Sequence, residues 1–284
     1  MKIGISGASG QLGQAILADL AARDADAHVV AISRTPGSLG GGIEAREGDY
    51  DRPATLASAY AGLDRLVIIP SADMQPGVRA KQFVAAIDAA VAAGVGHILL
   101  VSAAGTRKKA EPHIIAPYWA GEQHLMKVAP AWTIVRMNYY AEAFALDAQM
   151  AAGAGILAAL GEGRVAYVSR GDLAAAVVGV LIGEGHDGAI YSATGPHAFT
   201  GAERAAIASE LVGQPIGFAV VTEAAMRGSL EQAGLPEGLR NAILSIQADY
   251  AAGTYDIVTG DVERLAGRPP KTLADVLKET GVGQ

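Results

Sequence analysis

Three glycines near the start of the chain have the spacing of a phosphate-binding turn. Gly7, Gly10 and Gly13 follow the apolar residues 3–5 and lead into a helical pattern at residues 11–22. Glycine at these positions permits a tight turn, lets backbone N–H groups approach a pyrophosphate, and lets the helix pack closely with its positive end toward the phosphates. Because the motif stands between a strand and a helix, it predicts a dinucleotide site rather than an incidental glycine turn. The expected contacts are Gly7, Ser9, Gly10, Gln11, Leu12 and Gly13.

The end of the second predicted strand indicates which dinucleotide is bound. The strand pattern at residues 28–33 is followed by Arg34, and no acidic residue occurs between Val29 and Gly42. An acidic side chain here would accept hydrogen bonds from the ribose 2′-hydroxyl of NAD, whereas an arginine offers a forked guanidinium to the 2′-phosphate of NADP. The sequence therefore predicts NADPH as the cofactor, the alternative being that Arg34 is a solvated surface residue.

Several other kinds of site are excluded by what the chain lacks. It has no cysteine, so thiolate catalysis, disulfides and cysteine metal sites are ruled out. Its six histidines show no H-E-x-x-H or comparable spacing, so no metal site is expected. The net charge of −7 argues against nucleic acid as a partner. The longest apolar run, residues 173–182, is too short to span a bilayer. With a strand beginning at the N-terminus, no signal peptide is expected, and the protein is predicted to be cytoplasmic.

Strand and helix patterns alternate through the first half of the chain. The apolar run at residues 66–69 is continuous, as in a strand buried on both faces of a parallel sheet, and residues 98–102 are expected to form a further strand. This order predicts an α/β fold with a Rossmann-type doubly wound parallel sheet and ligands at the carboxyl ends of the strands. A short third strand is expected to end at residues 48–51 and another strand is expected at 132–136, with helices at 53–61, 77–93 and 118–128. Further cofactor contacts are expected at Asp49, Tyr50, Pro70, Ser71 and Ser102, although the alanines after Ser102 favour a packing role for it over a hydrogen bond.

The second half is less regular and predicts a smaller, mainly helical C-terminal lobe. Strands are expected at residues 165–168 and 190–193, with a helix at 172–182 whose N-cap is Asp172. Beyond residue 200 the patterns predict helices at 200–212, 222–234 and 236–252, a short strand at 215–220, and a closing helix from residue 272. We expect an NADP-binding domain at 1–136, completed by 164–195, and a substrate-binding lobe at 137–163 and 196–284.

Several local motifs together resemble the atypical short-chain dehydrogenase/reductases, and most closely the NmrA-like branch with its bacterial NAD(P)H:quinone oxidoreductases and triphenylmethane reductases. The residues that carry the resemblance are G-A-S-G-Q-L-G at 7–13, S-R at 33–34, G-D-Y at 48–50, A-G-E-Q at 120–123, W-T-I-V-R-M-N-Y-Y-A-E at 132–142, R-G-D-L-A at 170–174 and G-L-P-E-G at 234–238. The resemblance covers essentially the whole chain. It implies a Rossmann-type sheet, NADPH as hydride donor and a small substrate lobe.

One departure from the wider superfamily concerns the proton donor. Its reductases usually carry Tyr-x-x-x-Lys, eight and four residues before a glutamate that itself stands about fourteen residues before the arginine ending strand six. Glu122 and Arg136 match that frame, which puts Ile114 in the tyrosine position and Tyr118 in the lysine position. The usual acid and its lysine are both absent, as they are in many NmrA-like relatives.

Reduction of a quinone needs less proton assistance than carbonyl reduction, because the acceptor ring delocalises the arriving charge. An enzyme without the tyrosine–lysine pair can work chiefly by positioning the acceptor against the nicotinamide in a dry pocket. The expected catalytic residues are Tyr118, Asn138 and Tyr139, and the expected substrate contacts are Tyr118, Tyr139, Tyr140 and Arg170. For Tyr118 the alternative is a core aromatic on a helix face.

The leading hypothesis is an NADPH-dependent reductase of a quinone or a related conjugated aromatic acceptor. One alternative is a non-catalytic NAD(P)-sensing regulator of the NmrA type, and another is a reductase of a different small aromatic or ether substrate. The expected partner is a small aromatic substrate, a homodimer is left open, and neither nucleic acid nor a membrane is expected as a partner.

Overall fold

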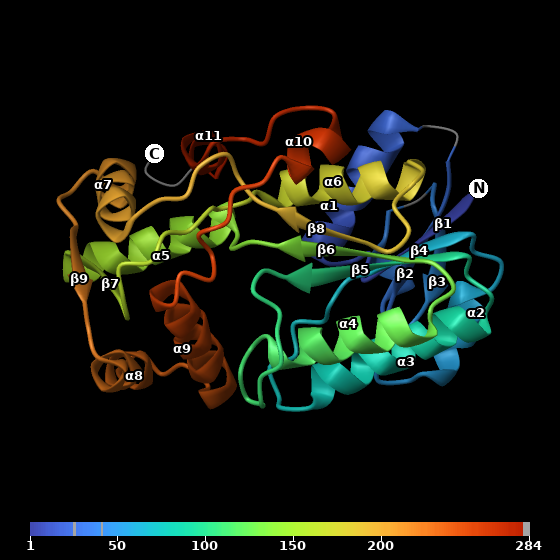
Figure 1. Ribbon diagram of the computed structural model, residues 1–284, viewed down its shortest axis with the longest axis horizontal. Helices are drawn as coiled ribbons and strands as arrows, with labels where there is room; N and C mark the ends of the chain where they lie inside the picture. Colours follow the sequence, from blue (N-terminus) through green and yellow to red (C-terminus); the bar gives the residue numbers. More distant parts are fainter. Residues whose placement is uncertain (25–26, 41, 281–284) are drawn as a thin grey trace.

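A seven-stranded, entirely parallel sheet forms the centre of the protein (Figure 1). The computed structural model describes residues 1–24, 27–40 and 42–280. The strand order is β3-β2-β1-β4-β5-β6-β8, which is the doubly wound Rossmann arrangement expected from the sequence. The strands are β1 Lys2–Ser6, β2 His28–Ser33, β3 Glu44–Glu47, β4 Arg65–Ile68, β5 His97–Ala103, β6 Trp132–Met137 and β8 Ala189–Ala193.

Helices cover both faces of this sheet, which explains why the central strands are apolar on both sides. On one face α1 (Gln11–Arg23), α6 (Arg170–Ile182) and α10 (Asp261–Ala266) pack together. On the other face lie α2 (Ala54–Tyr60), α3 (Val78–Ala92) and α4 (Ala116–Val128). A short 3-10 helix, η1 (Pro36–Ser38), follows β2. Two separate hydrophobic cores result, one on each face of the sheet.

The winding of the chain reverses beside β1. This strand pairs with β2 on one side and with β4 on the other, and all of these pairings are parallel. The connections from the carboxyl ends of β1 and β4 therefore diverge, and a crevice opens between them, the usual place for a ligand in an open α/β sheet.

A second unit, at the left of Figure 1, is built around a two-stranded parallel sheet of β7 (Ile156–Ala159) and β9 (Gly217–Val220). We call it the lobe. Its helices are α5 Ala141–Ala154, α7 Gly201–Val212, α8 Glu223–Gln232, α9 Glu237–Ala251 and α11 Leu273–Glu279. They enclose a core of their own that is rich in tyrosine and phenylalanine. Among the residues described, none of the helices has the length and apolar character needed to cross a membrane.

The strand expected at residues 165–168 is wrong. Only isolated bridges occur there, from Val165 to Phe199 and from Val168 to Tyr140. All four residues of the segment are buried, so an apolar run that reads as a strand is here an extended connection between the sheet and the lobe. No prediction covered α5, β7 or α10.

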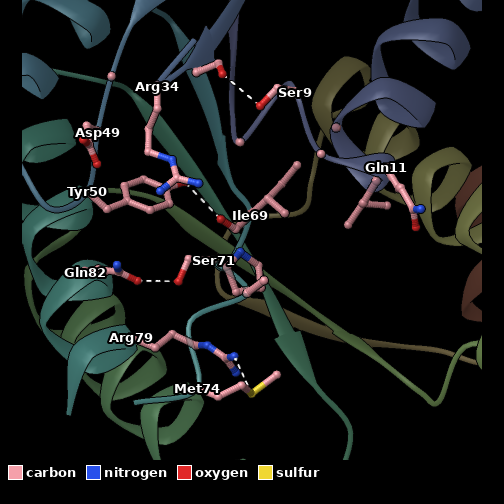
Figure 2. Close-up of a pocket in the computed structure, with 18 of the residues that line it drawn as sticks. Ser9, Gln11, Arg34, Asp49, Tyr50, Ile69, Ser71, Met74, Arg79 and Gln82 are labelled. Atoms are coloured by element: carbon pink, nitrogen blue, oxygen red, sulfur yellow. Dashed lines mark hydrogen bonds between the residues drawn. The ribbon is translucent and has the colours of Figure 1, made fainter. Parts of the chain in front are cut away.

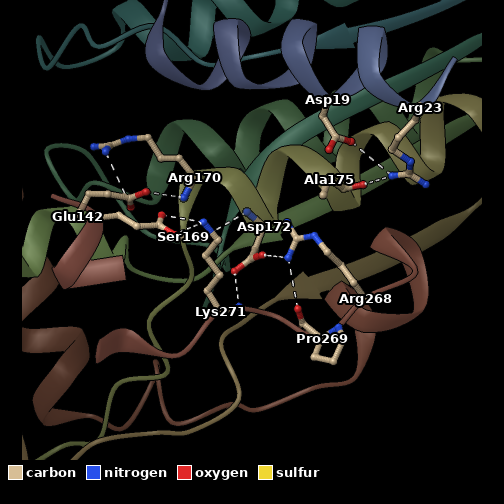
Figure 3. A network of polar contacts seen from close by, with 11 residues as sticks. Asp19, Arg23, Glu142, Ser169, Arg170, Asp172, Ala175, Arg268, Pro269 and Lys271 are labelled. Atoms are coloured by element: carbon tan, nitrogen blue, oxygen red, sulfur yellow. Dashed lines mark hydrogen bonds and ion pairs between the residues drawn. The ribbon is translucent and has the colours of Figure 1, made fainter. Parts of the chain in front are cut away.

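The N-cap expected at Asp172 is also wrong. Ser169 is the N-cap of α6, and its hydroxyl accepts the N–H of Asp172 at 2.9 Å. The fully buried carboxylate of Asp172 instead accepts Nη1 of Arg268 at 2.6 Å and the backbone N–H of Lys271 at 2.8 Å (Figure 3). Asp172 therefore ties the chain after α10 to the start of α6, which is next to the functional site.

Candidate functional site

A cleft of about 480 Å³ lies at the carboxyl ends of β1, β2 and β4, at the crevice that the topology predicts (Figure 2). Its walls come from the turn before α1, the loops after β2, β3 and β4, the start of α3, the start of α4 and the segment after β6. The residues of the sequence prediction that line it are Gly7, Ser9, Gly10, Gln11, Leu12, Gly13, Arg34, Asp49, Tyr50, Pro70, Ser71, Tyr118, Tyr140 and Arg170.

The glycine turn has the geometry that its spacing indicates. Gly7 has a φ of +95°, and its N–H and that of Ala8 both donate to the carbonyl of Ile32 at 3.0 Å. A Cβ added at Gly13 would lie 2.7 Å from Cα of Ala8, so only glycine lets α1 approach the turn this closely. At the N-cap, Gly10 makes no side-chain capping bond. The N–H groups of the first turn of α1 are therefore left for a ligand in the cleft.

Arg34 extends into the cleft from the loop after β2 and is exposed. Within the described part of the chain no carboxylate lies within ion-pair distance of its guanidinium. Next to it, the hydroxyl of Ser33 donates to that of Ser9 at 2.9 Å, and the N–H of Thr35 donates to Ser33 Oγ at 3.1 Å. An uncapped helix start and an available arginine in one cleft fit the pyrophosphate and the 2′-phosphate of NADPH.

The wall formed after β3 and β4 is held in place by its own hydrogen bonds. Asp49 accepts Nε of Arg52 at 3.0 Å and the N–H of Asp51 at 3.1 Å. Burial acts to raise the pKa of Asp49, but the hydrogen bonds from Arg52 and the N–H of Asp51, together with the nearby positive charges, lower the pKa below its usual value. Tyr50 donates its hydroxyl hydrogen to the carbonyl of Ile69 at 3.0 Å. The carboxylate of Asp49 therefore already accepts hydrogen bonds from within this wall. The wall offers a ligand a contact surface rather than a free carboxylate.

The opposite end of the cleft is largely aromatic and apolar. Ile114 and Tyr118, which occupy the tyrosine and lysine positions of the superfamily frame, both line it. Met137 and Tyr140 form the wall after β6. Arg170 lies over the ring of Tyr140 at 4.9 Å, and its Nη1 is 3.8 Å from a carboxylate oxygen of Glu142 (Figure 3).

The lining residues that the sequence prediction did not name as site residues include Met74, Arg79 and Gln82. Gln82 accepts the hydroxyl of Ser71 at 2.5 Å and donates to Asp51 at 2.8 Å. On the sequence alone, Arg79 and Gln82 are polar residues of an amphipathic helix. The only available signal was that this helix follows a strand whose carboxyl end lies at the crevice.

Ser102, Asn138 and Tyr139 are not among the residues that line the cleft. Ser102 is fully buried and donates to Glu122 at 2.6 Å. Asn138 donates to the carbonyl of Tyr255 at 3.2 Å and accepts the N–H of Tyr139 at 2.7 Å. The ring of Tyr139 packs edge-on against Tyr250 in the core of the lobe. At these strand ends Asn138 and Tyr139 therefore face the lobe, and Ser102 faces α4, instead of the crevice.

Comparisons with a protein-family model and with known proteins indicate the same kind of protein. Residues 7–184 match the NAD(P)H-binding family. Over 282 residues the chain is 31% identical to quinone oxidoreductase 2 of Escherichia coli strain K12, and the match covers 96% of each chain.

Two solved structures have nearly the same fold over their whole length. The NADPH-dependent quinone oxidoreductase of Escherichia coli in complex with NADPH superposes with a TM-score of 0.90 at 30% identity, covering 98% of this chain and 99% of that one. The triphenylmethane reductase of a Citrobacter species in complex with NADP(H) gives a TM-score of 0.88 at 26% identity, with coverage of 98% and 99%. The similarity therefore includes the lobe as well as the central sheet.

Proposed function

The chain belongs to the NAD(P)H-binding family, and from this premise we propose that it is an NADPH-dependent reductase of quinones or related conjugated aromatic acceptors. The observation that carries the proposal is the single cleft that joins the glycine turn and Arg34 to an aromatic end at Tyr118 and Tyr140. The likeness to a quinone oxidoreductase and a triphenylmethane reductase over almost the whole chain supports an acceptor of this kind.

In the proposed complex, the first-turn N–H groups of α1 bind the pyrophosphate and Arg34 binds the 2′-phosphate. Charge-assisted hydrogen bonds of this type contribute about 1.5–3 kcal/mol each. Bound in this way, NADPH supplies a hydride to the acceptor. Because Arg34 and α1 lie at one end of the cleft, the reacting part of the cofactor is expected toward Tyr118 and Met137 at the other.

At the acceptor end the residues work mainly by positioning. Ile114, Met137 and Tyr140 offer apolar and aromatic surfaces that exclude water and hold a flat ring. Burial raises the pKa of Tyr118, although the nearby guanidinium of Arg79 acts in the opposite direction. The phenol therefore keeps its proton at neutral pH and can donate a hydrogen bond to an acceptor oxygen. A hydroquinone anion released from such a site takes its proton from water.

We assign residues 1–136 and 164–195 to the cofactor-binding unit and residues 137–163 and 196–284 to the acceptor lobe, except for α10, which packs against α6 on the central sheet. Within this division Asn138 and Tyr139 are positioning residues. The bond from Asn138 to Tyr255 and the packing of Tyr139 against Tyr250 hold the neighbouring Met137 and Tyr140 at the cleft. A homodimer and a cytoplasmic location stay predictions.

The proposal is tested by measuring NADPH consumption with a panel of quinones, triphenylmethane dyes and aromatic ketones, alongside NADPH binding. The expected result is turnover of at least one quinone or dye that a Gly10→Val variant lacks. Tight NADPH binding without turnover of any member of the panel would instead favour a protein that senses the cofactor.

A further inference from the structure

Arg79 stands at the first turn of α3, with its side chain at the acceptor end of the cleft. The residue is only 5% exposed. It lines both the main cleft and a second, smaller pocket of about 20 Å³ between residues 73–75, residues 111–117 and α9. In Figure 2 its guanidinium points away from α3 toward Met74, and Ile69 and Ser71 lie between it and Arg34.

All the contacts of this guanidinium are with uncharged groups. Nη2 donates to the carbonyl of Asp73 at 2.8 Å and lies 3.4 Å from Sδ of Met74. Nη1 donates to the hydroxyl of Tyr118 at 3.4 Å, and the guanidinium carbon lies 5.4 Å from the centre of the tyrosine ring. Nε is buried and has no hydrogen-bond partner among the described residues. In that part of the chain, no carboxylate lies within 4.0 Å of the group.

A buried cation of this kind is costly, because it loses its hydration and gains no opposite charge in return. The other two arginines of the cleft are in a different situation. Arg34 is exposed to solvent, and Arg170 lies 3.8 Å from Glu142. Among the arginines of the cleft, Arg79 is therefore the one that is buried and is not paired with a carboxylate of the described residues. An anionic group on a ligand would stabilise its charge.

We infer that Arg79 is the recognition residue for an anionic substituent on the acceptor, such as a carboxylate, sulfonate or phosphate carried by the aromatic ring. The inference rests on the proposed function and narrows its substrate class. In the proposed complex the cofactor phosphates are bound by α1 and Arg34, across Ile69 and Ser71 from Arg79. The hydroxyl of Tyr118, which Arg79 touches, is then placed beside the same acceptor.

The first experiment compares two acceptors at saturating NADPH: 1,4-naphthoquinone-2-sulfonate and the uncharged 2-methyl-1,4-naphthoquinone. The measured quantity is the ratio of their kcat/KM values. Loss of a charge-assisted bond is expected to lower this ratio about tenfold or more in Arg79→Met, mainly through KM for the sulfonate. Arg79→Lys keeps the charge and should restore part of the preference. The control is Lys81→Met, which removes an exposed charge from the same helix and should leave the ratio unchanged.

The second experiment measures binding without turnover. Dissociation constants of naphthalene-2-carboxylate and naphthalene-2-carboxamide are determined for the NADPH complex of the natural protein and of Arg79→Met. The carboxylate should bind about tenfold or more tightly than the amide, and the variant should lose this difference. Because this readout needs no reaction, it supports or refutes the anion site even if no quinone is reduced.

Three outcomes would overturn the inference. The first is an equal loss of kcat/KM for both quinones, which would make Arg79 structural. The second is an unchanged preference in Arg79→Met. The third is a weaker affinity for NADPH with no change in the carboxylate-to-amide difference, which would assign Arg79 to a cofactor phosphate. If Arg79→Met does not fold, Arg79→Gln, which keeps a donor for the carbonyl of Asp73, replaces it in both experiments.

Discussion

The carboxylate of Glu122 on α4 accepts two hydrogen bonds from Arg136 on β6, at 2.8 Å from Nε and 2.6 Å from Nη2. Glu122 is fully buried, and the hydroxyl of Ser102 donates a third bond to it at 2.6 Å. The pair joins α4 to the sheet, and Tyr118 stands one turn before Glu122 on the same helix. The ion pair thus fixes how the first turn of α4 faces the cleft.

Replacing Arg136 with methionine should destabilise the protein, because the buried carboxylate of Glu122 would lose the cation that accompanies it and two of its hydrogen bonds. The expected loss is about 3–5 kcal/mol of unfolding free energy, measured by urea denaturation. The double variant Arg136→Met/Glu122→Leu should recover most of it. Arg227→Met, which breaks an exposed pair with Glu223, is the control and should cost less than about 1 kcal/mol. A loss of that small size for Arg136→Met would show that the pair does not hold α4.

The first half of the fold could be predicted because its signals are local. Continuous apolar runs at β4 and β5 and the glycine spacing before α1 depend only on neighbouring residues, and the structure has these elements within a few positions. The spacing of Glu122 and Arg136 was also informative about position. It placed Ile114 and Tyr118 at the tyrosine and lysine positions of the superfamily, and both residues line the cleft.

The rest depends on contacts between distant parts of the chain. Residues 165–168 have the composition of a strand. Because they lie between the sheet and the lobe, however, they form only isolated bridges and no continuous strand. Arg79 contacts Tyr118, which lies 39 positions further along the chain, so the periodicity of its own helix could not predict that Arg79 is buried. Tyr139 follows a strand end at the crevice, yet the aromatic core of the lobe takes its side chain.

The cofactor preference is expected to depend on Arg34. No carboxylate of the described residues pairs with its guanidinium, so Arg34→Ala should weaken NADPH binding by about 1.5–3 kcal/mol and change NADH binding little. Titration of both cofactors into both proteins measures this. Arg227→Ala serves as the control, since that residue lies on α8 of the lobe. Equal losses for the two cofactors would refute a contact with the 2′-phosphate.

Gly10 and Gly13 should respond differently to the same substitution. A Cβ at Gly10 would meet only the carbonyl oxygen of Gly7, at 3.4 Å, which is ordinary contact. Gly10→Val should therefore fold but fail to bind NADPH, because the side chain would occupy the phosphate position. At Gly13 the added atom would lie 2.7 Å from Cα of Ala8, so Gly13→Val should lose stability as well. Normal NADPH affinity in a folded Gly10→Val protein would contradict the assignment of the turn.

Tyr118→Phe should lower the turnover of a quinone only modestly. Ile114 stands where the superfamily acid is expected, and water can protonate the reduced acceptor, so no single side chain should be indispensable for the proton. The decrease in kcat is expected to stay below about a hundredfold, the lower end for loss of a true general acid. Steady-state kinetics at saturating NADPH provide the measurement. An inactive variant with intact NADPH affinity would identify Tyr118 as the acid.

Asp147 on α5 should make the stability of the protein depend on pH. Burial raises its pKa to about 6, against the opposing effect of Arg204. A carboxyl whose folded pKa exceeds its unfolded value stabilises the fold while protonated, and this contribution is lost as the pH rises through about 6. The neighbouring tyrosines 139, 167 and 250 have pKa values raised above 10, so they do not titrate in this range.

Asp147→Asn should therefore match the natural protein in unfolding free energy near pH 4 and exceed it by about 1–3 kcal/mol near pH 8. The measurement is urea denaturation across this range. Asp256→Asn is the matched control, because that carboxylate is about half exposed beside Arg164 and should show no such rise. A constant difference between Asp147→Asn and the natural protein at every pH would mean that the carboxyl titrates as it does in the unfolded chain, and that its burial in the lobe carries no electrostatic cost.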